Sequence, residues 1–202
     1  MDMNLANKLT MLRVFMIPAF LLVLFLGPEP MNRYIAVIIF IVASLTDMLD
    51  GKIARKYNLV SNFGKFMDPL ADKFMVIGAM FVILYRTLAL YGEAKIFANV
   101  FFWAFMIVIF RELAVTSIRL VVSGSSGIVI AANMLGKIKT CTQIACVICC
   151  IAEPVIYGLL EQEALLKLRP ASLVTSALML IFTLWSGINY IVSYWKYLDP
   201  EK

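Results

Sequence analysis

Four aspartates in one stretch of the chain are spaced as helix neighbours. Asp47 and Asp50 are three residues apart, and Asp68 and Asp72 are four apart. Such spacings place side chains on one helix face, and a short connection makes the two helices antiparallel neighbours whose acidic faces can meet. Carboxylates that converge in a partly dehydrated site need a compensating cation. Hard oxygen ligands select Mg²⁺, Mn²⁺ or Ca²⁺, and we expect one or two ions here, Mg²⁺ or Mn²⁺.

Small residues lie on the same helix faces as these aspartates. Gly51 and Ala54 share the face of the first two, and Gly64 shares that of the second two. They leave room for a flat or bulky ligand close to the backbone. Arg55, just beyond the first acidic face, is placed to contact a phosphate or a base edge. Four acids with small residues between them favour a ligand site over the alternative, which is a set of salt bridges with the nearby cations Lys52, Arg55, Lys65 and Lys73.

Four basic residues further along the chain form a second candidate group, consisting of Arg111, Arg119, Lys137 and Lys139. Several buried cations suit a phosphorylated ligand, because guanidinium and ammonium groups form charge-assisted bonds with phosphate. An uncharged alcohol has no such need. Lys137 and Lys139 are about 200° apart on an ideal helix, so only one of them is expected to point straight into a pocket. The alternative is that the four are positively charged anchors that contact lipid headgroups.

The composition indicates the elements that must position these residues. Hydrophobic residues make up 62% of the 202, mean hydropathy is +0.90, and 15% are charged, whereas globular proteins have about a quarter charged. A helix needs about 20 apolar residues to cross a bilayer. Six segments meet or approach this length: 9–26, 34–55, 65–85, 95–119, 128–160 and 171–194. We expect an all-α integral membrane protein with six transmembrane helices in one domain, residues 1–202.

Charges near the helix ends predict the orientation. With the N-terminus in the cytoplasm, both termini are cytoplasmic and all but five of the 18 Lys and Arg lie on that side, which satisfies the positive-inside rule. The same topology gathers the aspartates and the second basic group at one depth, in a polar cavity open to the cytoplasm. Charges inside membrane helices are by default functional. We therefore expect a multi-pass protein of the cell membrane with its active site on the cytoplasmic side.

A divalent-cation channel or carrier is the alternative from a different functional class. It would continue its polar residues across the membrane, but the outer halves of the second and third helices, 34–43 and 75–84, are almost wholly apolar. The acids therefore predict a dead-end pocket. Histidine is absent, so a general base must be a carboxylate or an amine. No basic stripe stands apart from the apolar segments, so we expect no nucleic-acid partner.

The acidic segments resemble a known signature. The pattern D-x2-D-G-x2-A-R-x8-G-x3-D-x3-D is typical of the CDP-alcohol phosphatidyltransferase family, and this sequence matches every fixed position. The resemblance implies a six-helix membrane fold, usually a homodimer, in which an alcohol displaces CMP from a CDP-linked lipid. By the same resemblance the metal ligands would be Asp47, Asp50, Asp68 and Asp72, and Asp72 would in addition be the general base. The residues around the CDP group would be Gly51, Ala54, Arg55 and Gly64.

Other segments resemble the members of this family that use glycerol 3-phosphate. They are residues 7–18, Arg111-Glu112, 117–119 and 136–140. With the signature, the resemblance covers nearly all of 7–143. It implies CDP-diacylglycerol and glycerol 3-phosphate as substrates, with Arg111, Arg119, Lys137 and Lys139 as candidates for binding the acceptor phosphate. The alternatives within the family are inositol phosphate or phosphatidylglycerol as the acceptor.

Overall fold

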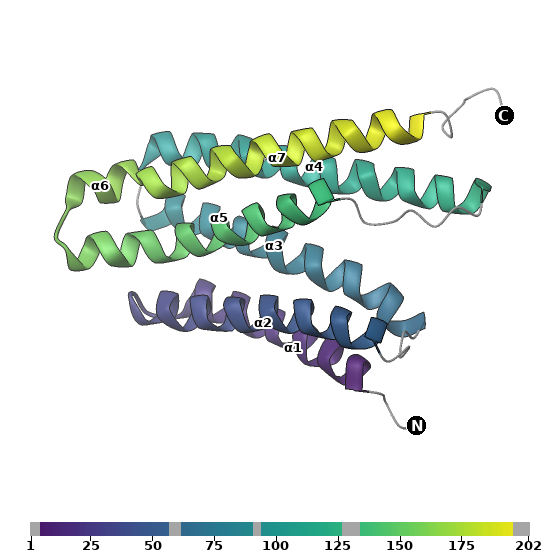
Figure 1. Ribbon diagram of the computed structural model, residues 1–202. Helices are drawn as coiled ribbons and strands as arrows, with labels where there is room; N and C mark the ends of the chain where they lie inside the picture. Colours follow the sequence, from purple (N-terminus) through teal and green to yellow (C-terminus); the bar gives the residue numbers. More distant parts are fainter. Residues whose placement is uncertain (1–4, 57–61, 91–93, 127–133, 196–202) are drawn as a thin grey trace.

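A computed structural model describes residues 5–56, 62–90, 94–126 and 134–195 (Figure 1). Within these ranges, the side chains of 5–8, 48–56, 62–66, 68, 90 and 123–126 are outside the description. The described residues form six long helices and one short helix, with no strand, which confirms the all-α prediction. The helices are α1 (Leu5–Leu26), α2 (Met31–Lys56), α3 (Asn62–Leu90), α4 (Lys95–Ser126), α5 (Met134–Leu159), α6 (Glu163–Leu168) and α7 (Pro170–Tyr194).

Each expected segment falls in a different long helix, and the last one, 171–194, matches α7 to within one residue. α5 begins at Met134, and the start of the segment expected from residue 128 lies outside the described residues. The short α6 was not expected. It ends at Leu168; the next residue, Arg169, has a left-handed backbone with φ 50°, and Pro170 then starts α7. Proline suits the first turn of a helix because the amide it lacks would have no helical partner there.

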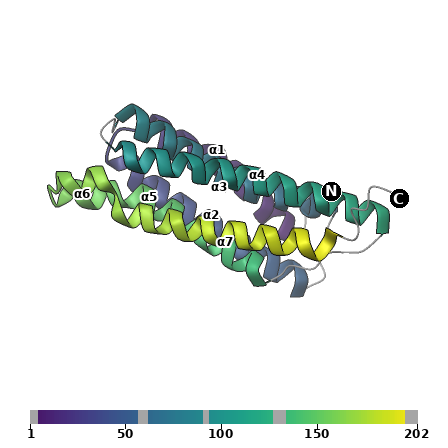
Figure 2. The same cartoon turned by 90° about the horizontal axis from the view of Figure 1, so that it is seen from above.

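The long helices run alternately up and down one bundle. Figure 1 shows both chain termini at the same end, and the turned view in Figure 2 agrees. We call this the terminal end; it holds the starts of α1, α3 and α5 and the ends of α2, α4 and α7. The opposite end, with the α1–α2 and α5–α7 connections, is the turn end. α1 packs against α2 and α3, while α7 packs against α4 and α5, and α5 also contacts α2 and α3.

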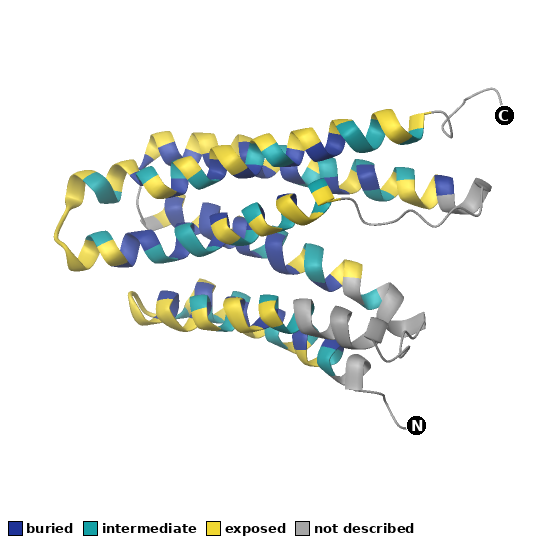
Figure 3. Cartoon of the chain, in the orientation of Figure 1, coloured by how far each residue is buried: buried dark blue, intermediate teal, exposed yellow. Residues whose placement is uncertain are grey.

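Buried and exposed residues both occur along the helices (Figure 3), and large apolar side chains are found in both classes. In the core, the rings of Phe20 and Phe40 are 5.3 Å apart. On the outside, Phe110 is 76% exposed and Val192 is 71% exposed, which is costly in water but favourable against lipid. In the part of the chain that the structure describes, three stretches are long and apolar enough to cross a membrane: Leu9–Leu26, Met134–Leu159 and Glu163–Tyr194.

Buried charges at the turn end hold the helix ends in place. Arg86 donates to the carbonyls of Leu24 at 2.6 Å and Phe25 at 3.0 Å, and to the carboxylate of Glu29 at 2.7 Å. The last carbonyls of a helix lack partners within the helix, so Arg86 on α3 caps α1. Arg33 on α2 donates to the same glutamate at 2.7 Å.

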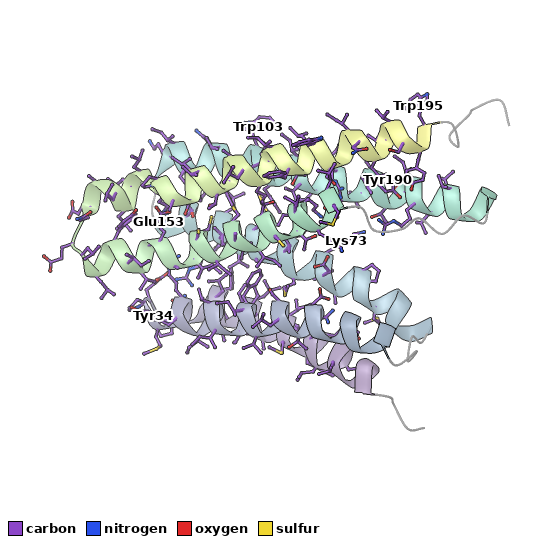
Figure 4. All side chains as sticks on the ribbon, viewed as in Figure 1. Tyr34, Lys73, Trp103, Glu153, Tyr190 and Trp195 are labelled. Carbon is purple, nitrogen blue, oxygen red and sulfur yellow. The ribbon has the colours of Figure 1, made fainter. Side chains whose placement is uncertain are left out.

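A buried glutamate of α5 has the equivalent role at the start of α7. Glu153 accepts hydrogen bonds from the backbone amides of Ala171 at 2.8 Å and Ser172 at 2.7 Å, and from the Ser172 hydroxyl. Figure 4 shows Glu153 at the turn end, with Lys73 and Tyr190 further towards the terminal end. The turn-end charges are thus bound to other parts of the fold, and the predicted site residues belong to the other half of the bundle.

Candidate active site

Asp47 on α2 is paired with an arginine of α1. Arg13 Nη1 lies 2.5 Å from Asp47 Oδ1, and the side chain of Arg13 is fully buried while that of Asp47 is 37% exposed. The α1–α2 hairpin places them at the same depth, because the two helices run antiparallel from the turn end. Arg13 was not among the predicted site residues. The charge of Asp47, one of the two aspartates on the first acidic face, is therefore neutralised by Arg13.

Asp72 on α3 is the charge around which the neighbouring helices converge. It interacts electrostatically with Asp47 of α2 and Arg13 of α1, and also with Glu112 of α4 and Lys139 of α5. Residues from four other helices therefore act on one partly buried carboxylate. Asp47 and Asp72 thus interact electrostatically, and the site predicted for them stays a prediction.

The structure describes only part of the expected contact between the two acidic helices. α2 and α3 are antiparallel (Figure 1), and α1 and α5 each pack against both of them. The side chains where the end of α2 would face the start of α3, from 48 to 66, lie outside the described residues. A direct contact between the two acidic faces therefore stays a prediction.

Glu112 on α4 joins the predicted cations to one another. Its Oε1 accepts from Lys139 Nζ of α5 and, at 3.3 Å, from Nη1 of Arg111. The backbone carbonyl of Glu112 accepts from the Thr116 hydroxyl at 2.6 Å, and Thr116 in turn accepts from Lys73 of α3. Glu112 is only 8% exposed. Glu112 thus contacts Lys139 and Arg111 directly and Lys73 through Thr116, so it connects cations from three helices.

Arg111 reaches α7 as well as Glu112. Its Nη2 donates to the Ser186 hydroxyl at 2.7 Å. A Cβ at the next residue, Gly187, would lie 3.0 Å from Arg111 Cγ, which is closer than side-chain carbons pack. The glycine therefore lets the arginine side chain lie directly against α7. This contact fixes the direction in which the Arg111 guanidinium points.

The other predicted cations differ in their exposure. Lys139 is 6% exposed and lies inside the bundle, whereas Lys137 is exposed on its outside. The expectation that only one of the two lysines points inward is therefore confirmed. Arg119 is exposed nearer the terminal end, with its guanidinium carbon 5.8 Å from the centre of the Tyr190 ring. Arg119 also interacts electrostatically with Lys73, so it belongs to the same charged group.

Several predicted site residues can be placed only by their helices. Asp50, Gly51, Ala54 and Arg55 belong to the last turns of α2, and Gly64 and Asp68 to the first turns of α3. Their side chains lie outside the described part of the structure. Asp68 precedes Asp72 by one turn of the same continuous helix, which is the arrangement that the spacing predicts. The roles of these residues stay predictions.

The donor chemistry around Asp47 and Asp72 fits a divalent cation. Their negative charges repel each other, and the Arg13 guanidinium is already held by Asp47. A further positive charge bound by carboxylate oxygens would relieve this repulsion, and oxygen is the donor that Mg²⁺ and Mn²⁺ prefer. Among the described side chains, no three His, Cys, Asp or Glu gather as a metal site, but Asp50 and Asp68 are outside that set.

The sequence analysis missed Glu112 and two uncharged polar residues beside it. Gln143 lies about one turn beyond Lys139 on α5, and Thr183 lies three residues before Ser186 on α7. Gln143 Nε2 and Thr183 Oγ1 are buried with no hydrogen-bond partner among the described residues. The signal for Glu112 was present, because a carboxylate inside an apolar helix must be paired. Nothing in the sequence pattern singles out the other two.

The matches to known proteins agree with this arrangement. The profile of a family described as CDP-alcohol phosphatidyltransferase matches residues 3–195. The chain is 37% identical over 209 residues to a Bacillus subtilis (strain 168) protein named CDP-diacylglycerol–glycerol-3-phosphate 3-phosphatidyltransferase, covering 98% of each chain. An Escherichia coli (strain K12) protein of the same name is 30% identical over 196 residues, covering 95% of this chain and 94% of that one.

A mycobacterial protein is similar over most of the chain. The Mycobacterium tuberculosis (strain ATCC 25618 / H37Rv) protein named probable phosphatidylglycerophosphate synthase is 34% identical over 190 residues. The matched region covers 93% of this chain and 80% of the mycobacterial one. All three matches therefore include the helices that carry the acidic and basic groups.

Proposed function

The chain belongs to the CDP-alcohol phosphatidyltransferase family, and from that membership we propose that it transfers the phosphatidyl group of CDP-diacylglycerol to sn-glycerol 3-phosphate. The products would be phosphatidylglycerophosphate and CMP. Relatives similar over nearly the whole chain carry the name of this activity. The structural observation that carries the proposal is the buried group of Arg111, Glu112 and Lys139 beside Asp72.

This basic group suits an acceptor that carries a phosphate. Lys139 and Arg111 would bind the phosphate through charge-assisted hydrogen bonds, and Arg119 would contribute from the terminal end. Lys137 points out of the bundle, so we assign it no direct contact. The unpaired polar atoms of Gln143 and Thr183 suit the hydroxyl groups of a small polyol, because buried polar atoms normally have partners.

The acidic group would act on the donor lipid. Asp47, Asp50, Asp68 and Asp72 would hold one or two Mg²⁺ or Mn²⁺ ions, which supply positive charge to the diphosphate of CDP-diacylglycerol and to the departing CMP. Gly51, Ala54 and Gly64 would leave space for the CDP group, and Arg55 would contact it. We therefore propose that residues of α2 and α3 bind the donor lipid and that residues of α4, α5 and α7 bind the acceptor.

Asp72 lies between the two groups and is the proposed general base. The acceptor hydroxyl would give its proton to the Asp72 carboxylate as its oxygen forms a bond to the lipid-side phosphorus. The bond from that phosphorus to the CMP oxygen breaks, and CMP leaves with the electron pair. Asp72 interacts with both the acidic and the basic residues, which supports this role.

We further propose that the bundle crosses the cell membrane six times, with both termini in the cytoplasm. Support comes from the shared location of the termini (Figure 1) and from the charge bias of the sequence. The donor lipid would then reach the site from within the bilayer and the soluble acceptor from the cytoplasm. A homodimer, which the family resemblance implies, stays a prediction.

The acceptor is tested with purified protein, CDP-diacylglycerol and Mg²⁺, offered one alcohol at a time. The alcohols are glycerol 3-phosphate, inositol phosphate, serine and phosphatidylglycerol, and CMP release is measured. We expect release with glycerol 3-phosphate to exceed that with each other alcohol. Faster release with inositol phosphate or phosphatidylglycerol would assign the chain to another activity of the same family. Mg²⁺ flux through protein-containing liposomes, without turnover, would support the channel alternative.

A further inference from the structure

An apolar pocket of about 230 Å³ lies between α1 and α3. Its α1 wall is formed by Val14, Ile17, Pro18 and Leu21, and its α3 wall by Met67, Leu70, Ala71 and Phe74. Ile17 and Ala71 are buried and form the floor, whereas Phe74 is 63% exposed. The pocket is therefore a groove that opens on the apolar outer surface of the bundle, where lipid would lie.

The walls of this pocket continue directly from the polar site. Ala71 immediately precedes Asp72, the carboxylate that interacts with Asp47 and Arg13. Val14 likewise follows Arg13, which pairs with Asp47. Successive residues of a helix are about 1.5 Å apart along its axis. On both walls, the apolar lining therefore lies within a few ångströms of a charged residue. A ligand that fills both regions must be amphipathic, with its anionic group beside the aspartates and its apolar part in the groove.

The groove has a closed end at Leu21. A Cβ on Gly78 would lie 3.0 Å from Leu21 Cδ1, so α1 and α3 are in close contact there. Towards the terminal end the lining continues past Asp72 to Val14 and Met67. Apolar cavities of about 150 Å³ accommodate a benzene molecule, so a volume of about 230 Å³ holds several methylene groups. The groove is therefore large enough for part of an acyl chain.

We infer that this groove holds one acyl chain of the CDP-linked lipid donor and that Leu21 limits how far the chain extends. The inference rests on the proposed function, since it assigns the groove to the donor of that reaction. It adds a determinant of chain-length preference on α1 and α3, away from the residues that bind the acceptor. A bulk membrane lipid is the other occupant of matching chemistry, and it would leave donor selection unaffected.

Two substitutions change the groove in opposite directions. Ala71→Leu fills its floor, and Leu21→Ala opens its closed end. The test measures kcat/KM for CDP-dioctanoylglycerol, CDP-dimyristoylglycerol and CDP-distearoylglycerol in mixed micelles with saturating acceptor. We expect Ala71→Leu to lower the long-to-short selectivity ratio by about tenfold, the low end of what one methylene is worth in an apolar pocket. Leu21→Ala should shift the preference to longer chains, and both should leave the KM for the acceptor within about twofold.

Ala19→Leu is the matched control, because it makes the same change on α1 at an exposed position outside the groove. Its selectivity ratio should equal that of the wild type. Unchanged ratios in folded Ala71→Leu and Leu21→Ala would overturn the inference and assign the groove to bulk lipid. If Ala71→Leu does not fold, Leu21→Ala decides alone.

Measurements on the wild-type protein show separately whether the proposed function fails. If the wild type releases CMP with a different acceptor, the chain-length test is run with that acceptor, because the groove concerns only the donor. No CMP release from any CDP-lipid with any acceptor would overturn both the proposed function and the inference.

Discussion

At the scale of single residues, three cations near the proposed site are paired with carboxylates of the protein itself. Lys139 and Arg111 share one oxygen of Glu112, and Arg13 is paired with Asp47. The desolvation cost of a buried ion pair nearly offsets its attraction, but removing one partner leaves an uncompensated charge and is costly. Substitutions here should therefore have large effects that depend on the partner.

Asp72→Asn tests the proposed general base. The asparagine keeps the size of the side chain and one oxygen, but it loses the charge and nearly all basicity. Turnover should fall by about 10² to 10⁴, with a modest weakening of Mg²⁺ affinity and no recovery at saturating Mg²⁺. The measurement is CMP release against Mg²⁺ concentration with both substrates saturating.

Asp47→Asn is the control for that experiment, since its predicted role is metal binding alone. Its turnover should recover as Mg²⁺ rises. The variant also loses the Arg13 pairing, so its thermal stability is measured in parallel. If Asp72→Asn keeps more than about a tenth of wild-type turnover, less than the smallest loss expected of a base, then Asp72 is not the base.

Lys139 and Lys137 form a matched pair, two residues apart on one helix and different in burial. Lys139→Ala should raise the KM for glycerol 3-phosphate by roughly ten- to 150-fold, the equivalent of losing about 1.5–3 kcal/mol from a charge-assisted bond. The KM for CDP-diacylglycerol should stay near that of the wild type. Lys137→Ala should change neither constant appreciably. An unchanged KM for glycerol 3-phosphate in both variants would indicate that both lysines act as lipid anchors.

Glu112→Gln tests whether the buried glutamate positions Lys139. The glutamine keeps the shape but removes the charge that holds the lysine, so the KM for glycerol 3-phosphate should rise by roughly tenfold, the equivalent of about 1.4 kcal/mol. A residue that acts through another shows coupling in a double-mutant cycle. Adding Glu112→Gln to Lys139→Ala should therefore have little further effect on this KM. Fully additive effects would contradict the positioning role.

At the scale of helices, the arrangement of side chains along one helix could be predicted from the sequence, whereas contacts between helices were harder to predict. Spacings of three and four residues place aspartates on one face because the helical period is fixed, and Asp72 does interact with Asp47. The pairing of Arg13 with Asp47 depends on how α1 packs, which no local spacing shows. α6 was missed because six residues are too few for a hydrophobic period to be visible.

The start of α7 offers a prediction about stability that is separate from activity. Glu153→Ala removes the acceptor of the Ala171 and Ser172 amides, and a buried unsatisfied donor costs about 1–3 kcal/mol. The thermal midpoint in detergent should fall, while the KM for glycerol 3-phosphate stays unchanged. Glu163→Ala, at an exposed position on α6, is the control and should leave the midpoint unchanged. A normal midpoint for Glu153→Ala would show that this cap does not stabilise the bundle.

At the scale of the whole molecule, the bundle has charged groups towards its two ends and an apolar outer surface between them. The turn-end charges cap helices, as Arg86 and Glu153 do, whereas Asp47, Asp72, Glu112 and Lys139 interact across four helices nearer the terminal end. The predicted single domain is consistent with this arrangement, since the proposed site needs helices from both halves of the chain. Composition predicts the membrane setting, but it does not distinguish structural charges from functional ones.

The most direct test of the proposed activity follows the acceptor into the lipid product. Purified protein is incubated with CDP-diacylglycerol, Mg²⁺ and ³²P-labelled glycerol 3-phosphate, and lipid-soluble label is compared with the CMP released. We predict equal molar amounts of the two, with little CMP release when unphosphorylated glycerol replaces the labelled acceptor. CMP release without label in the lipid, or equal rates with glycerol and glycerol 3-phosphate, would contradict phosphatidyl transfer to a phosphorylated acceptor.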